Sequence, residues 1–202
     1  MSINLIELLG EEKIYPIIRC NDANKAEDIA FALVDAGVKV LEINIENPSI
    51  YNVIERVSKK TIVCAGGVIT NLQANHAFAS GATMFSSPIF QMNMVKISKN
   101  IRVPFLAGAT TANEAYVAWK ARIPLIKIFP VTALGGMRYI EDILRQMPFL
   151  NLMPMGNIKL DEVEAYLNSG ATAVGVGRDF YENLDSNQIT QRAKNIIEKI
   201  KG

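Results

Sequence analysis

The chain has 202 residues, about half of them apolar, with 21 basic and 20 acidic side chains and a net charge of +1. This length and composition allow one sizeable core, so we expect a single domain spanning residues 1–202. Balanced charge without a basic stripe argues against nucleic acid as a partner, while an acidic N-terminal segment and the lack of an 18-residue apolar run predict a cytoplasmic protein without a membrane partner.

A short helix is expected at residues 2–9, before the first extended run. A pattern then repeats, in which an alanine-rich helix ends at a small residue plus glycine and an apolar strand follows. The clearest copies are A-F-A-L-V-D-A-G before V-L-E-I-N-I, A-F-A-S-G before M-F-S-S-P, and A-Y-L-N-S-G before A-V-G-V-G. The repeat predicts strands and helices in alternation.

Eight strands are predicted, each followed by a helical segment. They are placed at 15–19, 38–45, 61–66, 84–88, 103–108, 125–129, 151–156 and 173–177, with the last helix at 188–201. Even spacing of eight such units predicts an α/β fold, a single (β/α)₈ TIM barrel with a short N-terminal helix. A doubly wound open sheet is the alternative, but no G-x-G-x-x-G motif follows the first strand. Capping boxes at Thr70–Gln73 and Thr111–Glu114 mark two helix starts.

The strand at 125–129 carries a lysine inside an apolar run, I-P-L-I-K-I-F-P-V. Because side chains alternate along a strand, Lys127 shares one face with Leu125 and Phe129, and isoleucines form the other. The same alternation in the strand at 38–45 turns Glu42 toward the barrel interior. Lys127 and Glu42 are therefore expected to face one cavity, at the C-terminal strand ends where barrel enzymes carry their active sites.

Two interpretations of this pair compete. In the structural one, Lys127 and Glu42 form a buried ion pair that fills the barrel, although such pairs often add no net stability. In the functional one, Lys127 forms a Schiff base with a ketone. Its amine must then be neutral, a state favoured by burial and by a nearby cation such as Arg19. Glu42 would act as general acid and base.

Other strand ends supply candidate substrate-binding residues. Arg19, Gly66, Gly67 and Pro88 close their strands and are expected to converge on the same cavity. The glycine-containing loops at 155–158 and 174–178 follow strands seven and eight, where barrel enzymes hold phosphate on backbone N–H groups.

Arg178 would add charge to this phosphate site or, in the alternative, form a surface ion pair with Asp179 or Asp185. With only two cysteines, Cys20 and Cys64, and one histidine, His76, the sequence predicts neither a disulfide framework nor a metal site.

The combination of L-E-I-N-I, C-A-G-G-V, S-S-P, L-I-K-I-F-P and G-V-G resembles the 2-keto-3-deoxy-6-phosphogluconate and 4-hydroxy-2-oxoglutarate aldolase family, from about residue 14 to residue 181. The segments I-I-R at 17–19, N-P-S at 47–49 and G-R-D-F-Y at 177–181 look more like the branch acting on 2-keto-3-deoxy-6-phosphogalactonate.

The resemblance implies a class I aldolase without metal or cofactor. Lys127 would form the Schiff base and Glu42 would move protons, so that a keto-acid is cleaved to pyruvate and either glyceraldehyde 3-phosphate or glyoxylate. Pro88 and Phe129 would wall the pyruvyl pocket, and the loops of Gly156 and Gly177 would receive the phosphate of a phosphorylated substrate. The same resemblance implies a homotrimer.

The departures from the family pattern all concern substrate binding. Glu46 stands where sugar-acid members usually carry the arginine that holds the pyruvyl carboxylate, and Gly67, Asn157 and Arg178 replace a threonine, a glycine and a serine. Arg19, with backbone N–H groups near Gly66 and Pro88, would then take over the carboxylate. Two other functions stay open: a phosphosugar epimerase or thiamine-phosphate-synthase-like barrel, and a binding module that has lost aldolase turnover.

Overall fold

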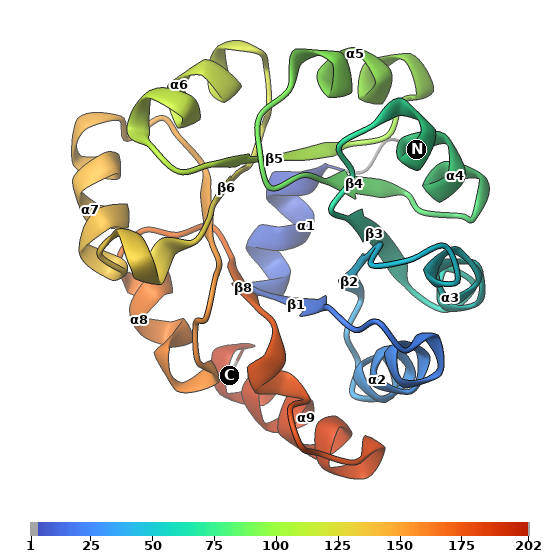
Figure 1. Ribbon diagram of the computed structural model, residues 1–202. Helices are drawn as coiled ribbons and strands as arrows, with labels where there is room; N and C mark the ends of the chain where they lie inside the picture. Colours follow the sequence, from blue (N-terminus) through green and yellow to red (C-terminus); the bar gives the residue numbers. More distant parts are fainter. Residues whose placement is uncertain (1–3, 202) are drawn as a thin grey trace.

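Strands and helices alternate through residues 4–201, the part of the chain that the computed structural model describes (Figure 1). The strands are β1 (Ile14–Ile18), β2 (Val40–Asn44), β3 (Ile62–Gly66), β4 (Met84–Ser86), β5 (Phe105–Ala109), β6 (Ile126–Ile128), β7 (Leu152–Pro154) and β8 (Val174–Val176). All eight predicted strands are confirmed, with ends that differ by a few residues.

The α-helices cover the outside of the sheet, except for the first (Figure 1). They are α1 (Leu5–Glu12), α2 (Ala23–Asp35), α3 (Ile50–Val57), α4 (Asn71–Ala79), α5 (Met92–Ile101), α6 (Ala112–Lys120), α7 (Met137–Gln146), α8 (Val163–Asn168) and α9 (Ser186–Lys201). Short 3₁₀ helices are η1 (Val131–Leu134), η2 (Leu160–Glu162) and η3 (Arg178–Phe180). Within the described residues, no helix is long and apolar enough to cross a membrane.

The eight strands are parallel and form a nearly closed barrel. Their order is β7-β6-β5-β4-β3-β2-β1-β8, so that consecutive strands from β1 to β7 pair with one another and β1 also pairs with β8. Between β7 and β8 the contact is a single bridge, Met155 to Gly175, together with a hydrogen bond from the Thr172 N–H to the Leu152 carbonyl at 2.9 Å. The predicted (β/α)₈ architecture is therefore confirmed.

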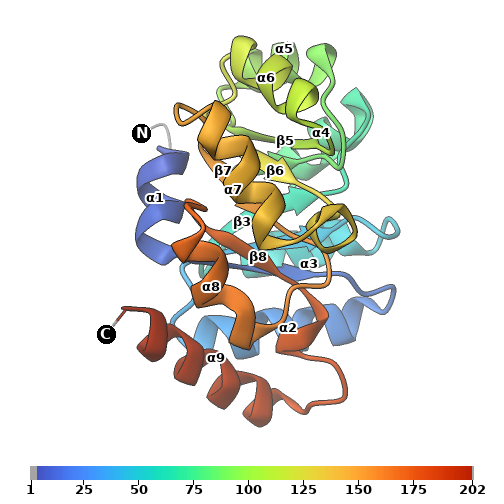
Figure 2. The ribbon, with the colours of Figure 1, turned by 90° about the vertical axis from the view of Figure 1, so that its left-hand side faces the viewer.

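The N-terminal helix closes one end of the barrel. It was predicted at residues 2–9, but α1 runs from Leu5 to Glu12 because the Asn4 side chain accepts a hydrogen bond from the Glu7 N–H and caps it there. Residues 2 and 3 lie outside the described residues. Leu5 and Leu9 of α1 are buried against the barrel interior, and Figure 2 shows the helix lying across that end.

One residue from every strand or strand start fills the interior above α1. These residues are Tyr15, Val40, Cys64, Met84, Leu106, Leu125, Met153 and Ala173, all in one buried cluster with Leu5 and Leu9. The intervening residues of the strands, such as Leu41, Ile43 and Ile126, belong instead to the cluster that packs on the helices. Because α1 and this layer block one end, a cavity is left only toward the C-terminal ends of the strands.

Candidate active site

Lys127 and Glu42 lie in the next layer of the barrel, two residues beyond the apolar layer. The even-numbered strands contribute this layer: Glu42 from β2, Ser86 from β4, Lys127 from β6 and Gly175 from β8. Since β2 and β6 are four strands apart in an eight-stranded barrel, their side chains meet across its interior. Three polar groups therefore converge at the floor of the remaining cavity.

The contacts of Lys127 are short and buried. Its Nζ lies 3.5 Å from Glu42 Oε1 and donates a hydrogen bond to Ser86 Oγ. Lys127 is 4% exposed, Glu42 2% and Ser86 0%. A lysine held this way has its ammonium out of bulk water but next to a carboxylate and a hydroxyl, both able to take up a proton or hydrogen bond.

Gly66 makes room for the carboxylate. A Cβ at position 66 would collide with Asn44 Oδ1 and would lie 2.5 Å from Glu42 Oε1, so no larger residue fits beside Glu42 on β3. Gly66 itself is buried and does not line the cavity. The structure thus places this predicted substrate-binding residue behind Glu42, where it determines the position of the carboxylate.

Tyr15 and Cys64 form the polar part of the layer beneath Glu42. Burial, followed by the nearby Cys64 and Glu42, raises the pKa of Tyr15 well above its ordinary value. Burial and the Glu42 charge likewise raise the pKa of Cys64, against smaller lowering effects of Tyr15 and Lys127. Within residues 4–201, neither the Tyr15 hydroxyl nor Glu42 Oε2 has a hydrogen-bond partner. Glu42 thus approaches Lys127 through Oε1, while Oε2 is enclosed by protein atoms.

A cavity of about 890 Å³ opens above Lys127 and Glu42. Its lining includes most of the predicted substrate-binding residues: Arg19, Gly67, Pro88, Phe129, Gly156, Asn157, Gly177 and Arg178. Segments that are far apart in the sequence therefore meet here, as the barrel topology predicts. Gly156 adopts φ +111°, and a Cβ there would lie 2.9 Å from Pro130 Cα, so this loop requires glycine.

Arg19 is paired with Glu46 at the mouth of the cavity. Arg19 Nε lies 2.9 Å from Glu46 Oε1, with the arginine side chain 68% and the glutamate side chain 22% exposed. The backbone of Arg19 is held by Tyr181, whose hydroxyl accepts from the Arg19 N–H at 3.1 Å. Arg19, which was expected to bind the pyruvyl carboxylate in place of the family's usual arginine, therefore pairs with the negative charge of Glu46.

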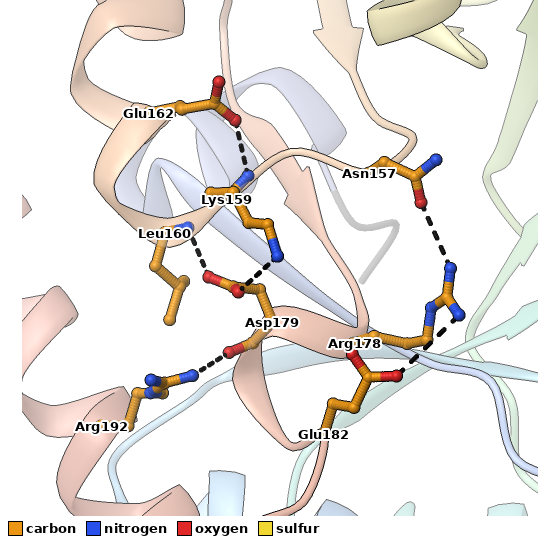
Figure 3. A network of polar contacts seen from close by, with 8 residues as sticks. All are labelled: Asn157, Lys159, Leu160, Glu162, Arg178, Asp179, Glu182 and Arg192. Atoms are coloured by element: carbon orange, nitrogen blue, oxygen red, sulfur yellow. Dashed lines mark hydrogen bonds and ion pairs between the residues drawn. The ribbon is translucent and has the colours of Figure 1, made fainter.

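Arg178 lies among polar contacts that connect the loops after β7 and β8 (Figure 3). Its Nη2 donates to Asn157 Oδ1 at 3.4 Å and its Nη1 lies 4.0 Å from Glu182 Oε1. The ion-pair partners considered from the sequence, Asp179 and Asp185, are wrong, because the i,i+4 spacing in the turn after β8 brings Glu182 to the guanidinium instead.

Asp179, in the segment after β8, contacts Lys159 and Leu160 in the segment after β7 (Figure 3). Its carboxylate accepts from the Leu160 N–H at 2.8 Å and pairs with Lys159 Nζ at 3.2 Å, while its carbonyl accepts from Arg192. Burial acts to raise the pKa of Asp179, but the Leu160 N–H and the Lys159 and Arg192 charges outweigh it and hold that pKa below its ordinary value. The loops are thus fixed to one another next to the cavity.

Sequence reasoning missed several side chains of this site, among them Ser86, Lys159, Tyr181 and Glu182. Ser86 was identifiable, because alternation from Met84 places it inward in the S-S-P segment, yet only Pro88 was taken from that strand. Lys159 and Tyr181 also line the cavity. They come from segments just beyond β7 and β8 and carry no spacing signal.

The fold and the site define a (β/α)₈ barrel with a buried lysine–carboxylate pair beneath a cavity at the C-terminal ends of its strands. The family pattern described as "Aldolase: KDPG and KHG aldolase" matches residues 5–199. The chain therefore belongs to the KDPG and KHG aldolase family, and it is an aldolase, a carbon–carbon lyase acting on small keto-acids.

Several known proteins are similar to this chain over most of its length. A 2-dehydro-3-deoxy-phosphogluconate aldolase of Haemophilus influenzae is 29% identical over 166 residues, 81% of this chain and 78% of the relative. A 2-dehydro-3-deoxy-6-phosphogalactonate aldolase of Escherichia coli is 24% identical over 155 residues, 74% and 75% of the two chains. A KDPG aldolase structure from Legionella pneumophila, with pyruvate captured at low pH as a covalent carbinolamine, has a TM-score of 0.87 at 22% identity over 97% of this chain and 99% of that one.

Proposed function

We propose that this aldolase works through a Schiff base on Lys127 and cleaves a 2-keto-3-deoxy sugar acid phosphate or 4-hydroxy-2-oxoglutarate. The observation that carries the proposal is the buried contact of 3.5 Å between Lys127 Nζ and Glu42 Oε1 at the floor of the cavity. The products are pyruvate and an aldehyde, glyceraldehyde 3-phosphate or glyoxylate.

The reaction begins when the neutral amine of Lys127 attacks the ketone carbon. The carbinolamine loses water to give a protonated imine, which draws electrons more strongly than the ketone did. The hydroxyl group two carbons away then loses its proton to Glu42, the carbon–carbon bond breaks, and its electron pair moves toward the imine nitrogen. An aldehyde leaves and the enamine of pyruvate stays bound to Lys127.

Glu42 returns the proton to the enamine carbon, and water then hydrolyses the imine to free pyruvate. A carboxylate suits both steps because it acts as base in one direction and as acid in the other. Glu42 has one oxygen beside the Lys127 ammonium and the other, Oε2, unbonded within the described residues. Ser86 orients the amine through its hydrogen bond with Nζ.

The charged ends of the substrate are assigned to two arginines. We place the carboxylate of the pyruvyl half at Arg19, helped by backbone N–H groups near Gly67 and Pro88, with Phe129 against the pyruvyl group. The phosphate is placed between the loops of Gly156 and Gly177, with Asn157 and Arg178 beside it. Arg178 is well exposed and only loosely paired, which leaves it able to turn toward a phosphate.

Borohydride trapping tests the mechanism. Incubation with pyruvate and borohydride is expected to leave a reduced pyruvate adduct on Lys127, read by peptide mass spectrometry. Lys127→Ala abolishes the adduct, and Lys159→Ala, which removes the other lysine lining the cavity, keeps it. An adduct that survives in Lys127→Ala contradicts the mechanism. An adduct without cleavage of any keto-acid would instead identify a binding module that has lost turnover.

We also propose that the chain acts in the cytoplasm as a single-domain subunit of a homotrimer. Two groups of exposed apolar side chains support association: Ile69, Leu72, Phe78, Ile89 and Met92 near α4 and the start of α5, and Tyr116, Val117, Trp119 and Phe149 near α6. Exposed apolar groups of this kind commonly mark subunit contacts. Sedimentation equilibrium at micromolar concentration is expected to give three times the chain mass, and a monomer mass would contradict this.

A further inference from the structure

Within residues 4–201, every cation that lines the cavity is paired with a carboxylate that also lines it. The pairs are Arg19 with Glu46, Lys127 with Glu42, Lys159 with Asp179, and Arg178 with Glu182. A cavity that receives anionic substrates thus contains as many internal anions as cations. An incoming carboxylate or phosphate has to compete with these internal partners.

The ion pairs differ in how readily they dissociate. Arg178 and Glu182 are 4.0 Å apart with both side chains more than half exposed, a geometry that contributes little and breaks readily. Arg19 and Glu46 are 2.9 Å apart, and the Glu46 side chain is only 22% exposed. Arg178 is therefore easily released to a ligand, whereas Arg19 keeps its carboxylate.

We propose that Glu46 determines substrate specificity because its carboxylate already pairs with the Arg19 guanidinium. A substrate with a negatively charged group at this position is therefore favoured only weakly over a neutral one. The proposal rests on the assignment of the pyruvyl carboxylate to Arg19 made above. A substrate carboxylate at Arg19 shares the guanidinium with Glu46, and the two negative charges repel each other across a few ångströms. Neutral ketones of the same size lose nothing from Glu46.

A purely structural role for Glu46 makes a different prediction. If Glu46 only positions Arg19, a glutamine at position 46 serves as well, because its amide oxygen accepts from the same Arg19 Nε. If the charge matters, glutamine retains the hydrogen bond and removes the repulsion. Glu46→Gln and Glu46→Ala therefore separate charge from position.

The test compares pyruvate with methyl pyruvate, which has the same ketone and no charge. Each is titrated into the full-length protein with borohydride, and labelling of Lys127 is followed by mass spectrometry. Glu46→Gln is expected to lower the half-labelling concentration of pyruvate roughly three- to tenfold at low salt and to leave that of methyl pyruvate unchanged. High salt reduces the difference. Glu182→Gln, the same change of charge two strands away, is expected to produce a smaller shift for pyruvate.

The alternative results have separate meanings. An unchanged ratio of the two half-labelling concentrations in Glu46→Gln overturns the proposal, and so does a rise for pyruvate in that variant. Absence of any Lys127 adduct in the wild-type protein refutes the Schiff-base mechanism instead. Pyruvate binding measured by calorimetry then decides the role of Glu46 without an imine, and equal affinities of wild type and Glu46→Gln overturn it.

Discussion

Lys127 and Glu42 are charged side chains buried in the interior of the barrel. Removing both charges from water costs several kcal/mol, and the attraction within the pair often fails to offset it. A pair selected for stability would form a direct charge-assisted bond of about 2.8 Å, but here Nζ and Oε1 are 3.5 Å apart and the lysine donates its hydrogen bond to Ser86 instead. This geometry leaves both charged groups accessible to a third reactant.

Glu42→Gln is expected to lower turnover of the cleaved keto-acid by about 10²- to 10⁴-fold, because the amide cannot exchange the proton. Pyruvate adduct formation on Lys127 should fall much less, since the size and the hydrogen-bonding oxygen are retained. Steady-state rates and borohydride labelling measured on one preparation give both values. If the two fall by the same factor, Glu42 organises the site and does not transfer protons.

Ser86→Ala removes the hydroxyl that accepts from Lys127 Nζ. We expect roughly tenfold slower adduct formation, because the amine loses the bond that orients it and stays buried with a donor unpaired. Ser87→Ala is the matched control, since Ser87 is equally buried but its hydroxyl contacts the Ile89 N–H, outside the lysine centre. Equal labelling rates in the two variants would show that Ser86 has no part in orienting Lys127.

Tyr15 and Cys64 predict an alkaline loss of stability. Both pKa values are raised in the folded chain, mainly by burial, so both groups stay protonated there. In the unfolded chain Tyr15 ionises at about pH 10 and Cys64 at about pH 8.5. Stability is thus fully present below about pH 8 and falls by roughly 1.4 kcal/mol per pH unit for each group as the pH rises above its unfolded pKa. Denaturant unfolding between about pH 7 and 10.5 measures it.

The contribution of each group is separated by substitution. Tyr15→Phe and Cys64→Ala should each flatten the slope of unfolding free energy against pH, whereas the other buried tyrosines continue to contribute in both variants. A slope unchanged by both substitutions would mean that these two groups ionise in the folded chain as readily as in the unfolded one.

At this scale the sequence placed the two central residues through strand alternation and most of the lining residues through their position at strand ends. The inward orientation of Lys127 and Glu42 follows from the alternation of side chains along their apolar strands, and the same alternation would have identified Ser86. The pairing of Arg19 with Glu46 and of Arg178 with Glu182 depends on rotamers of side chains on loops, which no periodicity specifies. The exclusion of Gly66 from the cavity likewise depends on the volume of its neighbours.

At the scale of elements, helix starts were the best predicted boundaries because their chemistry is local. Thr70 with Gln73 and Thr111 with Glu114 form complete capping boxes at α4 and α6. The predicted N-terminal helix starts three residues too early, because Asn4 was not recognised as its N-cap. Strand ends differ more, since hydrogen bonding between neighbouring strands stops where the twisted strands diverge, not where apolar residues end.

Thr111→Ala should lower the free energy of unfolding by about 1 kcal/mol, because the Glu114 N–H in the first turn of α6 loses the Thr111 side chain as its acceptor. The backbone N–H groups of Thr111 and Thr110 hold the pKa of Glu114 below its ordinary value, so this half of the box is present above about pH 4.5 and is lost as the pH falls. Denaturant unfolding at about pH 7 and about pH 3.5 measures both effects. A Thr111→Ala penalty near zero would show that α6 is held by packing alone.

At the scale of the whole molecule, the barrel is asymmetric along its axis. Every strand or strand start supplies one side chain to the layer over α1, and the charged Lys127 and Glu42 lie in the layer above it. Because α1 covers one end of the barrel (Figure 2), the cavity opens at the opposite end, where the C-terminal ends of the strands and their loops meet. The repeat in the sequence predicted this arrangement, while the use of the first helix as a plug was not predicted, since a helix before the first strand has no place in the repeat.

Leu9→Ala tests how far α1 supports the barrel. Leu9 is fully buried against the layer above α1, so its truncation should cost about 2–5 kcal/mol of unfolding free energy through lost burial and a cavity. Ile6→Ala on the same helix is the control, because Ile6 is 37% exposed and its loss should cost under about 1 kcal/mol. If α1 also holds the layer beneath Glu42, Leu9→Ala should in addition slow pyruvate labelling of Lys127 at temperatures where the protein stays folded. Equal stability of the two variants would mean that the barrel interior holds its shape without the helix.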